Sequence, residues 1–220
     1  MTLPKYISFI EKKEIWLSRA DQFEDQREGR FPDEMKDIIQ RAYEGMKDAP
    51  GIVTDANDFA DFLKKNTFIS CWHKNTEENM VMWAIYGKSC ESVAIQTTAE
   101  RFVSSFNPMT IPGNWLELKE VDYKNSGDIS GVIPYEECFF IKRPHFHFEN
   151  EVRLCLDTYN TQAPSKKHPT GYHLPININK LVDKVLVHPD CPEWFLEVVR
   201  SVNAKYNIKL PVMRGVCGNH

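Results

Sequence analysis

Several short apolar stretches are rich in β-branched or aromatic residues, a pattern that favours β-strands. In the longest of them, residues 144–157, apolar and polar side chains also alternate with a period of two. These stretches predict strands at residues 14–18, 67–72, 92–97, 116–123, 144–157, 181–188 and 208–213. Pro211 has no backbone N–H group, so we expect it on a strand at the edge of a sheet or at the first position of its strand.

Other stretches place apolar side chains three and four positions apart, the spacing of an amphipathic helix. The longest covers residues 33–47, where Met35, Ile38 and Ile39 begin the apolar stripe. Residues 77–86 are apolar nearly all round, which predicts a helix buried on most sides. Further helices are predicted at residues 57–65, 99–105 and 193–206.

Helical and strand-like patterns follow one another along the whole chain, and no clean linker separates them. The strands are too dispersed for a regular βαβ alternation, which indicates the α+β class. We therefore expect a single domain over residues 1–220, with a mixed or antiparallel β-sheet core and about five flanking helices. Two small packed sheets would also satisfy the pattern. Loops are expected at residues 124–131 and 158–171.

The amino-acid composition argues against some classes of binding partner. The 220 residues carry 27 Lys and Arg against 31 Asp and Glu, a formal net charge of −4. A pI near 6.0 gives no overall attraction to nucleic-acid phosphates or anionic lipid. No apolar run approaches the roughly 20 residues that span a bilayer, so no membrane partner is expected. The six scattered cysteines form no Cys-x-x-Cys pair and no secretory signal is visible, which favours a cytoplasmic protein with reduced thiols.

Candidate chemistry concentrates in the predicted strand at residues 144–157. Successive side chains of a strand point to opposite faces, so the titratable residues there would share one face. These residues are His145, His147, Glu149, Glu151, Arg153, Cys155 and Asp157. A row of titratable groups is typical of a functional site, although a half-solvated strand also presents a polar face.

Three interpretations of this row stay open. Two carboxylates about 7 Å apart on one strand face can act as a base and its orienting partner. His145 and His147 with Glu149 could instead ligate a metal, but no fourth ligand lies nearby in sequence, so we expect no metal. Glu151 and Arg153 could also simply neutralise each other as an ion pair.

Two further segments carry polar groups at the ends of predicted strands. A dense polar segment, residues 18–30, follows the first strand, and Ser70-Cys71-Trp72-His73 ends the second. Together with the titratable row, these segments resemble an uncharacterised bacterial family, domain of unknown function 2971. The matching features are Ile15-Trp16-Leu17-Ser18, Asp21, Phe23, Asp25, Glu28-Gly29, Ile69-Ser70-Cys71-Trp72, Met82-Trp83, Tyr86-Gly87 and Phe148-Glu149-Asn150-Glu151-Val152-Arg153. The resemblance covers nearly the whole chain and implies kinship of fold, since the family has no established activity.

A weaker resemblance suggests a reaction. An Arg on an early strand, a Ser on a middle strand and Glu-x-Glu on a later strand are similar to the Arg–Ser–Glu class of ADP-ribosyltransferase folds, which implies NAD as cofactor. The resemblance implies catalytic roles for Glu151, Glu149 and Ser70. It places Arg19, Trp72, Tyr86, His145 and His147 around the cofactor. The chain departs from the class in having Ser70-Cys71-Trp72 where Ser-Thr-Ser is usual, and Arg19 stands at the end of its strand.

Three functions follow as hypotheses. The first is an NAD-consuming ADP-ribosyltransferase-like or NAD-glycohydrolase-like enzyme, such as a bacterial toxin or phage-defence effector that modifies a protein or nucleic acid. The second is a non-catalytic binding or sensor module of a defence or regulatory operon, in which the Glu/Arg row ties strands together. The third is a metal-dependent phosphodiesterase that uses His145, His147 and Glu149.

Overall fold

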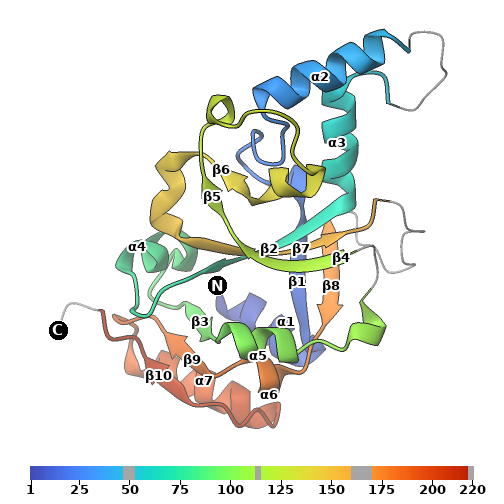
Figure 1. Ribbon diagram of the computed structural model, residues 1–220. Helices are drawn as coiled ribbons and strands as arrows, with labels where there is room; N and C mark the ends of the chain where they lie inside the picture. The colour runs from blue at the N-terminus through green and yellow to red at the C-terminus, as the bar shows by residue number, and fades with distance from the viewer. Residues whose placement is uncertain (47–52, 112–114, 160–169, 218–220) are drawn as a thin grey trace. The chain divides into compact units, whose positions relative to one another are not determined.

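The computed structural model describes residues 1–46, 53–111, 115–159 and 170–217 (Figure 1). Helices and antiparallel or mixed sheets make up these ranges, which confirms the predicted α+β class. The chain divides into two compact units, each built from separate stretches of sequence. Unit 1 contains Met1–Trp16, Asn75–Ile111 and His173–His220, and unit 2 contains Leu17–Lys74 and Pro112–Tyr172. The single domain over residues 1–220 stays a prediction.

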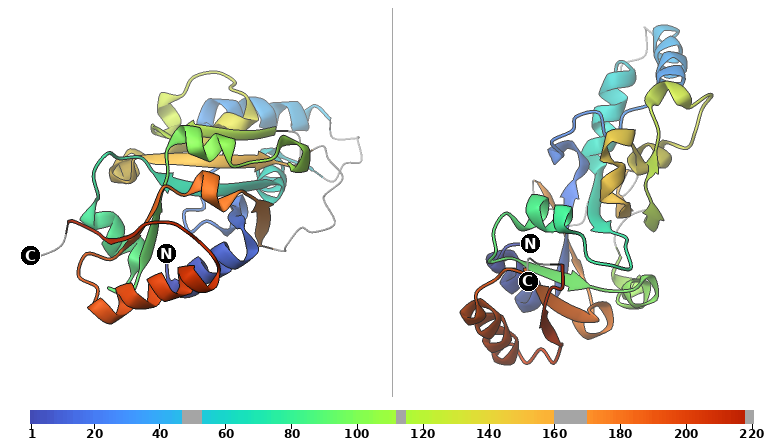
Figure 2. Two further views of the ribbon diagram at one scale, coloured as in Figure 1. Left: turned by 90° about the horizontal axis from the view of Figure 1, so that it is seen from below. Right: turned by 90° about the vertical axis from the view of Figure 1, so that its left-hand side faces the viewer.

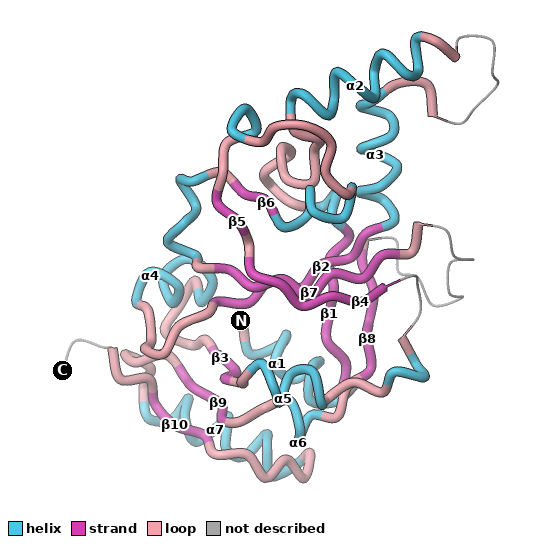
Figure 3. The backbone as a smooth tube through the Cα atoms, in the orientation of Figure 1, coloured by secondary structure: helices cyan, strands magenta, loops and turns pink. Residues whose placement is uncertain are grey.

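The strands form three sheets, drawn in magenta in Figure 3. A five-stranded sheet has the order β4 (Trp115–Glu120), β7 (Glu151–Asp157), β2 (Thr67–His73), β1 (Glu14–Arg19), β8 (Gly171–Pro175). A three-stranded sheet has the order β10 (Val212–Arg214), β9 (Lys184–Val187), β3 (Val93–Gln96), and β5 (Asp122–Tyr123) pairs with β6 (Ile141–Lys142). The strand after Pro211 lies at an edge, as predicted.

The helices include one that the pattern analysis missed. This is α1 (Leu3–Lys12), which has Pro4 in its first turn and buries Tyr6, Phe9 and Ile10 at helical spacing. The other α-helices are α2 (Asp33–Glu44), α3 (Ala56–Asn66), α4 (Met80–Met82), α5 (Ala99–Ser104), α6 (Ile178–Leu181) and α7 (Glu193–Lys205). The 3₁₀-helices are η1 (Ala20–Gln22), η3 (Pro108–Thr110), η4 (Ser126–Asp128), η5 (Tyr135–Phe140) and η6 (Pro144–Glu149), and η2 (Trp83–Gly87) is π-helical.

Each unit has its own core. In unit 2, α2 and α3 pack against each other (Figure 2). Both contribute to an apolar cluster that includes Ile69 of β2, Cys155 of β7 and Phe139 of η5. In unit 1, α1 and α7 are joined by a buried hydrogen bond in which the Tyr6 hydroxyl donates to Asn203 Oδ1 at 2.6 Å. Of the predicted loops, residues 160–169 lie outside the described residues, as does Lys47 of the predicted helix 33–47.

The structure corrects the prediction of one strand over residues 144–157. Only Glu151–Asp157 is extended, whereas Pro144–Glu149 forms a 3₁₀-helix. Asn150 separates the two with a left-handed φ of 39°, a conformation that Asn tolerates better than most residues. The alternation of His and Phe therefore does not mark a strand, and both His145 and Phe148 are exposed.

The helix predicted at residues 77–86 is present in part, but its predicted burial on most sides is wrong. The segment forms only a short α-helix followed by a π-helical turn, both in unit 1. Trp83 is buried, and its Nε1 donates to Glu78 Oε2 at 3.2 Å. The other large apolar side chains, Met80, Val81, Ile85 and Tyr86, are exposed, so the apolar residues outnumber the positions that face the core.

Candidate functional site

Five charged side chains meet in the interior of unit 2. We call them the buried charge network: Glu28, Lys142, Glu149, Glu151 and Arg153. Arg153 Nε lies 2.7 Å from Glu151 Oε1, and Arg153 Nη2 binds Glu28 Oε2. Lys142 Nζ lies 2.5 Å from Glu149 Oε2, 3.2 Å from Glu151 Oε2 and 3.4 Å from Glu28 Oε1. Each cation therefore bridges at least two carboxylates.

Local structure brings these groups together from four segments. Glu151 and Arg153 point to the same face of β7 because they are two residues apart on a strand. The turn at Asn150 carries Glu149 back beside them, and Lys142 comes from β6. Glu28 reaches the network from a loop in which Gly29 has a φ of +70°.

A side chain at Gly29 would not fit this loop. A Cβ atom there would lie 2.6 Å from Phe139 Cε1, so both the close approach and the positive φ require glycine.

The network is closed to solvent. Arg153 is 1% exposed, Glu151 5% and Glu149 7%. Burial alone would raise the pKa of Glu151, but the charges of Arg153 and Lys142 outweigh it and lower the pKa to about 2. Burial would lower the pKa of Lys142, and the surrounding carboxylates, chiefly that of Glu151, raise it instead. Glu151, Lys142 and Arg153 are therefore charged at neutral pH, and each lies within ion-pair distance of an opposite charge.

The structure does not bring Arg19 and Ser70 to Glu151. Ser70 is opposite Leu154 in the β2–β7 register, whereas Glu151 is opposite His73. Because neighbouring residues on a strand point to opposite faces, Ser70 and Glu151 lie on opposite faces of the sheet. Arg19 pairs with Phe68 and so shares the face of Ser70, where its guanidinium binds Asp21 Oδ1 at 2.6 Å.

The predicted histidines and Trp72 are also outside the network. His145 and His147 are exposed on η6, and the His147 ring packs against Tyr123. Trp72 donates its Nε1 to Ser70 Oγ at 3.1 Å in unit 2, whereas Tyr86 belongs to unit 1 and is half exposed. Within the described part of the chain, no group of three or more His, Cys, Asp or Glu residues is arranged to hold a metal ion.

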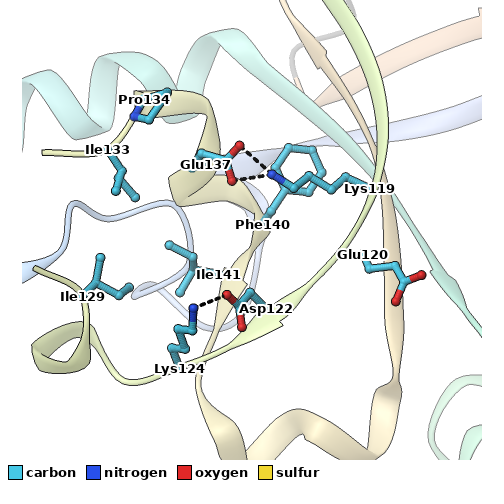
Figure 4. A pocket seen from close by; sticks show the side chains of 10 residues that line it. All are labelled: Lys119, Glu120, Asp122, Lys124, Ile129, Ile133, Pro134, Glu137, Phe140 and Ile141. Atoms are coloured by element: carbon cyan, nitrogen blue, oxygen red, sulfur yellow. Dashed lines mark hydrogen bonds and ion pairs between the residues drawn. The ribbon is translucent and has the colours of Figure 1, made fainter.

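A groove runs along β4 at the edge of the same unit. Its two adjoining hollows have volumes of about 400 and 380 Å³. The strand β4 forms one wall, and residues 129–137 form the other (Figure 4). Ile129, Ile133 and Phe140 give the larger hollow an apolar surface. Trp115 and Pro134 do the same for the smaller one.

The groove also carries an excess of negative charge. Five carboxylates line it against two lysines: Glu117, Glu120, Asp122, Glu136 and Glu137 against Lys119 and Lys124. Figure 4 shows both lysines paired, Lys119 with Glu137 at 2.5 Å and Lys124 with Asp122 at 2.6 Å. Within the ranges that the structure describes, Glu117 and Glu136 make no ion pair, although both are only half exposed.

Pattern analysis identified Glu149, Glu151 and Arg153 but missed Lys142 as their partner. Lys142 is seven and nine residues from the two glutamates, and no periodicity of a single strand or helix links these positions. The groove was missed as well, because its walls come from two segments that only the folded chain places side by side.

Comparisons with models of protein families, with curated proteins and with solved structures found no match to this chain. Kinship with domain of unknown function 2971 and with ADP-ribosyltransferase folds therefore stays a prediction. No helix in the described ranges has both the length and the apolar character needed to cross a membrane.

Proposed function

We propose that this chain is a non-catalytic binding module in which the buried charge network is structural and the groove along β4 receives the ligand. One observation carries the proposal: both oxygens of the Glu151 carboxylate are engaged by Arg153 and Lys142, in a site that is 5% exposed. A carboxylate that stabilises a cationic transition state must reach the substrate, and this one is turned inward.

The network has a clear structural task in unit 2. Arg153 Nη1 also donates to the backbone oxygen of Phe139 at 2.7 Å, and the Phe23 ring lies 5.6 Å from its guanidinium. The charges thus tie β7 to β6, to η5 and to the loop that contains Glu28. A buried pair of this kind specifies how segments are arranged more than it adds stability. A fixed arrangement of these segments in turn fixes the wall of the groove, since η5 supplies Glu137 and Phe140 to it.

The test compares the wild-type chain with Glu151→Gln. We expect the variant to unfold at a lower temperature because it leaves Arg153 and Lys142 with less compensating charge. We also expect neither protein to release nicotinamide from NAD. Release that the wild type shows and the folded Glu151→Gln variant lacks would contradict the proposal and support the NAD-consuming enzyme instead.

The state of the cysteines bears on the cellular compartment in which the protein acts. All six cysteines lie within the described residues and are free, and Cys71 and Cys90 are exposed. Exposed free thiols persist in a reducing compartment, so we expect the module to act in the cytoplasm.

A further inference from the structure

The groove is bounded by an unpaired strand edge. In the five-stranded sheet, β4 pairs with β7 on one side only. Among residues 1–46, 53–111, 115–159 and 170–217, no strand pairs with its other side. An unpaired edge presents backbone N–H and C=O groups that can pair with another extended chain.

The register tells which backbone groups face outward. Val121 donates its backbone N–H to Glu151 O at 2.9 Å, and Glu120 is opposite Val152. In an antiparallel pair, alternate residues direct both backbone groups to the partner strand and the residues between them direct theirs away. Leu116 and Leu118 therefore present their N–H and C=O groups to the open edge.

The side chains beside this edge favour one chemical class of partner. Glu117 and Glu136 are half-buried carboxylates without an ion pair among the described residues, and they lie beside the apolar surfaces of Trp115 and Pro134. A cation placed between them would gain two charge-assisted contacts, which are stronger beside an apolar surface than in bulk water. Successive side chains of an added strand point to opposite faces, so the neighbours of this cation would lie on the face of Leu116 and Leu118, which is apolar.

We propose that β4 binds an extended peptide segment of a partner protein by β-strand addition, and that the segment alternates apolar and basic side chains. The inference rests on the proposed binding function and specifies its ligand. Backbone hydrogen bonds to Leu116 and Leu118 hold the segment, and a lysine or arginine of the segment lies between Glu117 and Glu136. The two requirements are independent, because one concerns the peptide backbone and the other its charge.

The probe is a fluorescein-labelled nine-residue peptide of alternating valine and lysine, followed by fluorescence anisotropy with the full chain. Two further versions of the peptide carry N-methyl groups on every second backbone amide. One version is methylated at the valine amides and the other at the lysine amides. Because a strand presents only every second amide to its neighbour, we expect one methylated version to lose binding and the other to keep it. Hydrogen exchange should slow at the amides of Leu116 and Leu118 when the unmodified peptide is added.

The charge requirement is tested with a double variant. Glu117→Lys with Glu136→Lys should weaken binding by at least about tenfold, equivalent to about 1.4 kcal/mol. Glu197→Lys, an exposed glutamate of α7, is the matched control and should bind as the wild type does. If the double lysine variant does not fold, Glu117→Gln with Glu136→Gln should show a smaller loss in the same direction.

Three results would overturn the inference. The first is no binding of the probe, and the second is equal binding of both methylated versions. The third is a concentration-dependent dimer that both glutamate substitutions abolish, because a second copy of the chain would then occupy the edge. None of these measurements involves NAD, so their failure is distinguishable from failure of the proposed function, which the nicotinamide assay decides.

Discussion

Arg153 is the residue on which most of the buried charge network depends. It is 1% exposed, and its guanidinium contacts two carboxylates and one backbone carbonyl. A charge buried so deeply is tolerated because each nitrogen of the guanidinium has an acceptor. Removal of Arg153 therefore leaves Glu28 and Glu151 dependent on Lys142 alone.

We predict that Arg153→Met lowers the free energy of unfolding by about 3–5 kcal/mol, since it breaks a buried ion pair from one side. Glu151→Gln should cost a similar amount, and the double variant should cost less than the two single effects added together. Urea denaturation of the four proteins measures this coupling. Strict additivity would show that the two side chains do not act as a pair.

Gly29 is the second residue whose identity the structure requires. We predict that Gly29→Ala destabilises the protein by more than about 1 kcal/mol, because a methyl group would collide with the Phe139 ring at an unfavourable φ. Gly127→Ala is the control, since its nearest neighbour, Asp33 Oδ2, would lie 3.8 Å away. Thermal unfolding of both variants compares them directly, and equal melting temperatures would contradict the prediction.

Among the elements, the spacing and type of apolar residues predicted several helices and strands close to their observed bounds. The stripe that begins at Met35 gave α2, and β-branched and aromatic residues gave β2 and β9. The prediction failed where a few alternating residues are too short a stretch to distinguish a strand from a helical turn. The sequence from Pro144 to Glu149 alternates as a strand does, yet Pro144 removes an N–H donor and Asn150 favours a turn. Those two residues were the available signal against a continuous strand.

The turn at Asn150 also yields a prediction. Lys74 donates its backbone N–H to Asn150 O at 2.8 Å, and the Asn150 side chain donates to the backbone oxygen of Lys74. Asn150→Ala removes the side-chain bond and places a less tolerant residue at positive φ, so we expect a loss of about 1–2 kcal/mol. Asn150→Gly should recover part of it. Chemical denaturation measures the free energy of unfolding of the two variants. An Asn150→Ala protein as stable as the wild type would contradict the role given to the turn.

For the whole molecule, the network makes stability depend on pH at the acid end. The pKa of Glu151 is about 2 in the folded protein, below its ordinary value of 4.5. The folded state therefore binds a proton less readily than the unfolded chain does. The ionised Glu151 carboxylate contributes about 3 kcal/mol to the free energy of unfolding above about pH 4.5. This contribution is lost as the pH falls toward 2.

We predict that the difference in unfolding free energy between wild type and Glu151→Gln narrows as the pH falls from 4.5 to 2. Other carboxylates titrate in the same window, and the comparison with the variant isolates the contribution of Glu151. Urea denaturation of both proteins at half-unit pH intervals measures this difference in unfolding free energy. A difference that stays constant over this range would show that Glu151 is not held ionised by the network.

The class of the fold followed from sequence, but the candidate sites did not, because they join distant positions. Glu28 and Arg153 are 125 residues apart, and the groove joins β4 to a later loop. Local periodicity carries no information on such pairs. It reports which side of an element is apolar, whereas the identity of the facing element depends on the path of the chain.

The division of unit 1 into three stretches has a consequence for synthesis on the ribosome. Unit 2 ends at Tyr172, so all its residues have been translated before the last stretch of unit 1 begins at His173. The hydrogen bond between Tyr6 of the first helix and Asn203 of α7 can therefore form only after α7 has emerged. Unit 1 gains this contact late in translation, and we expect chaperones that bind exposed apolar segments to act on its first stretch before then.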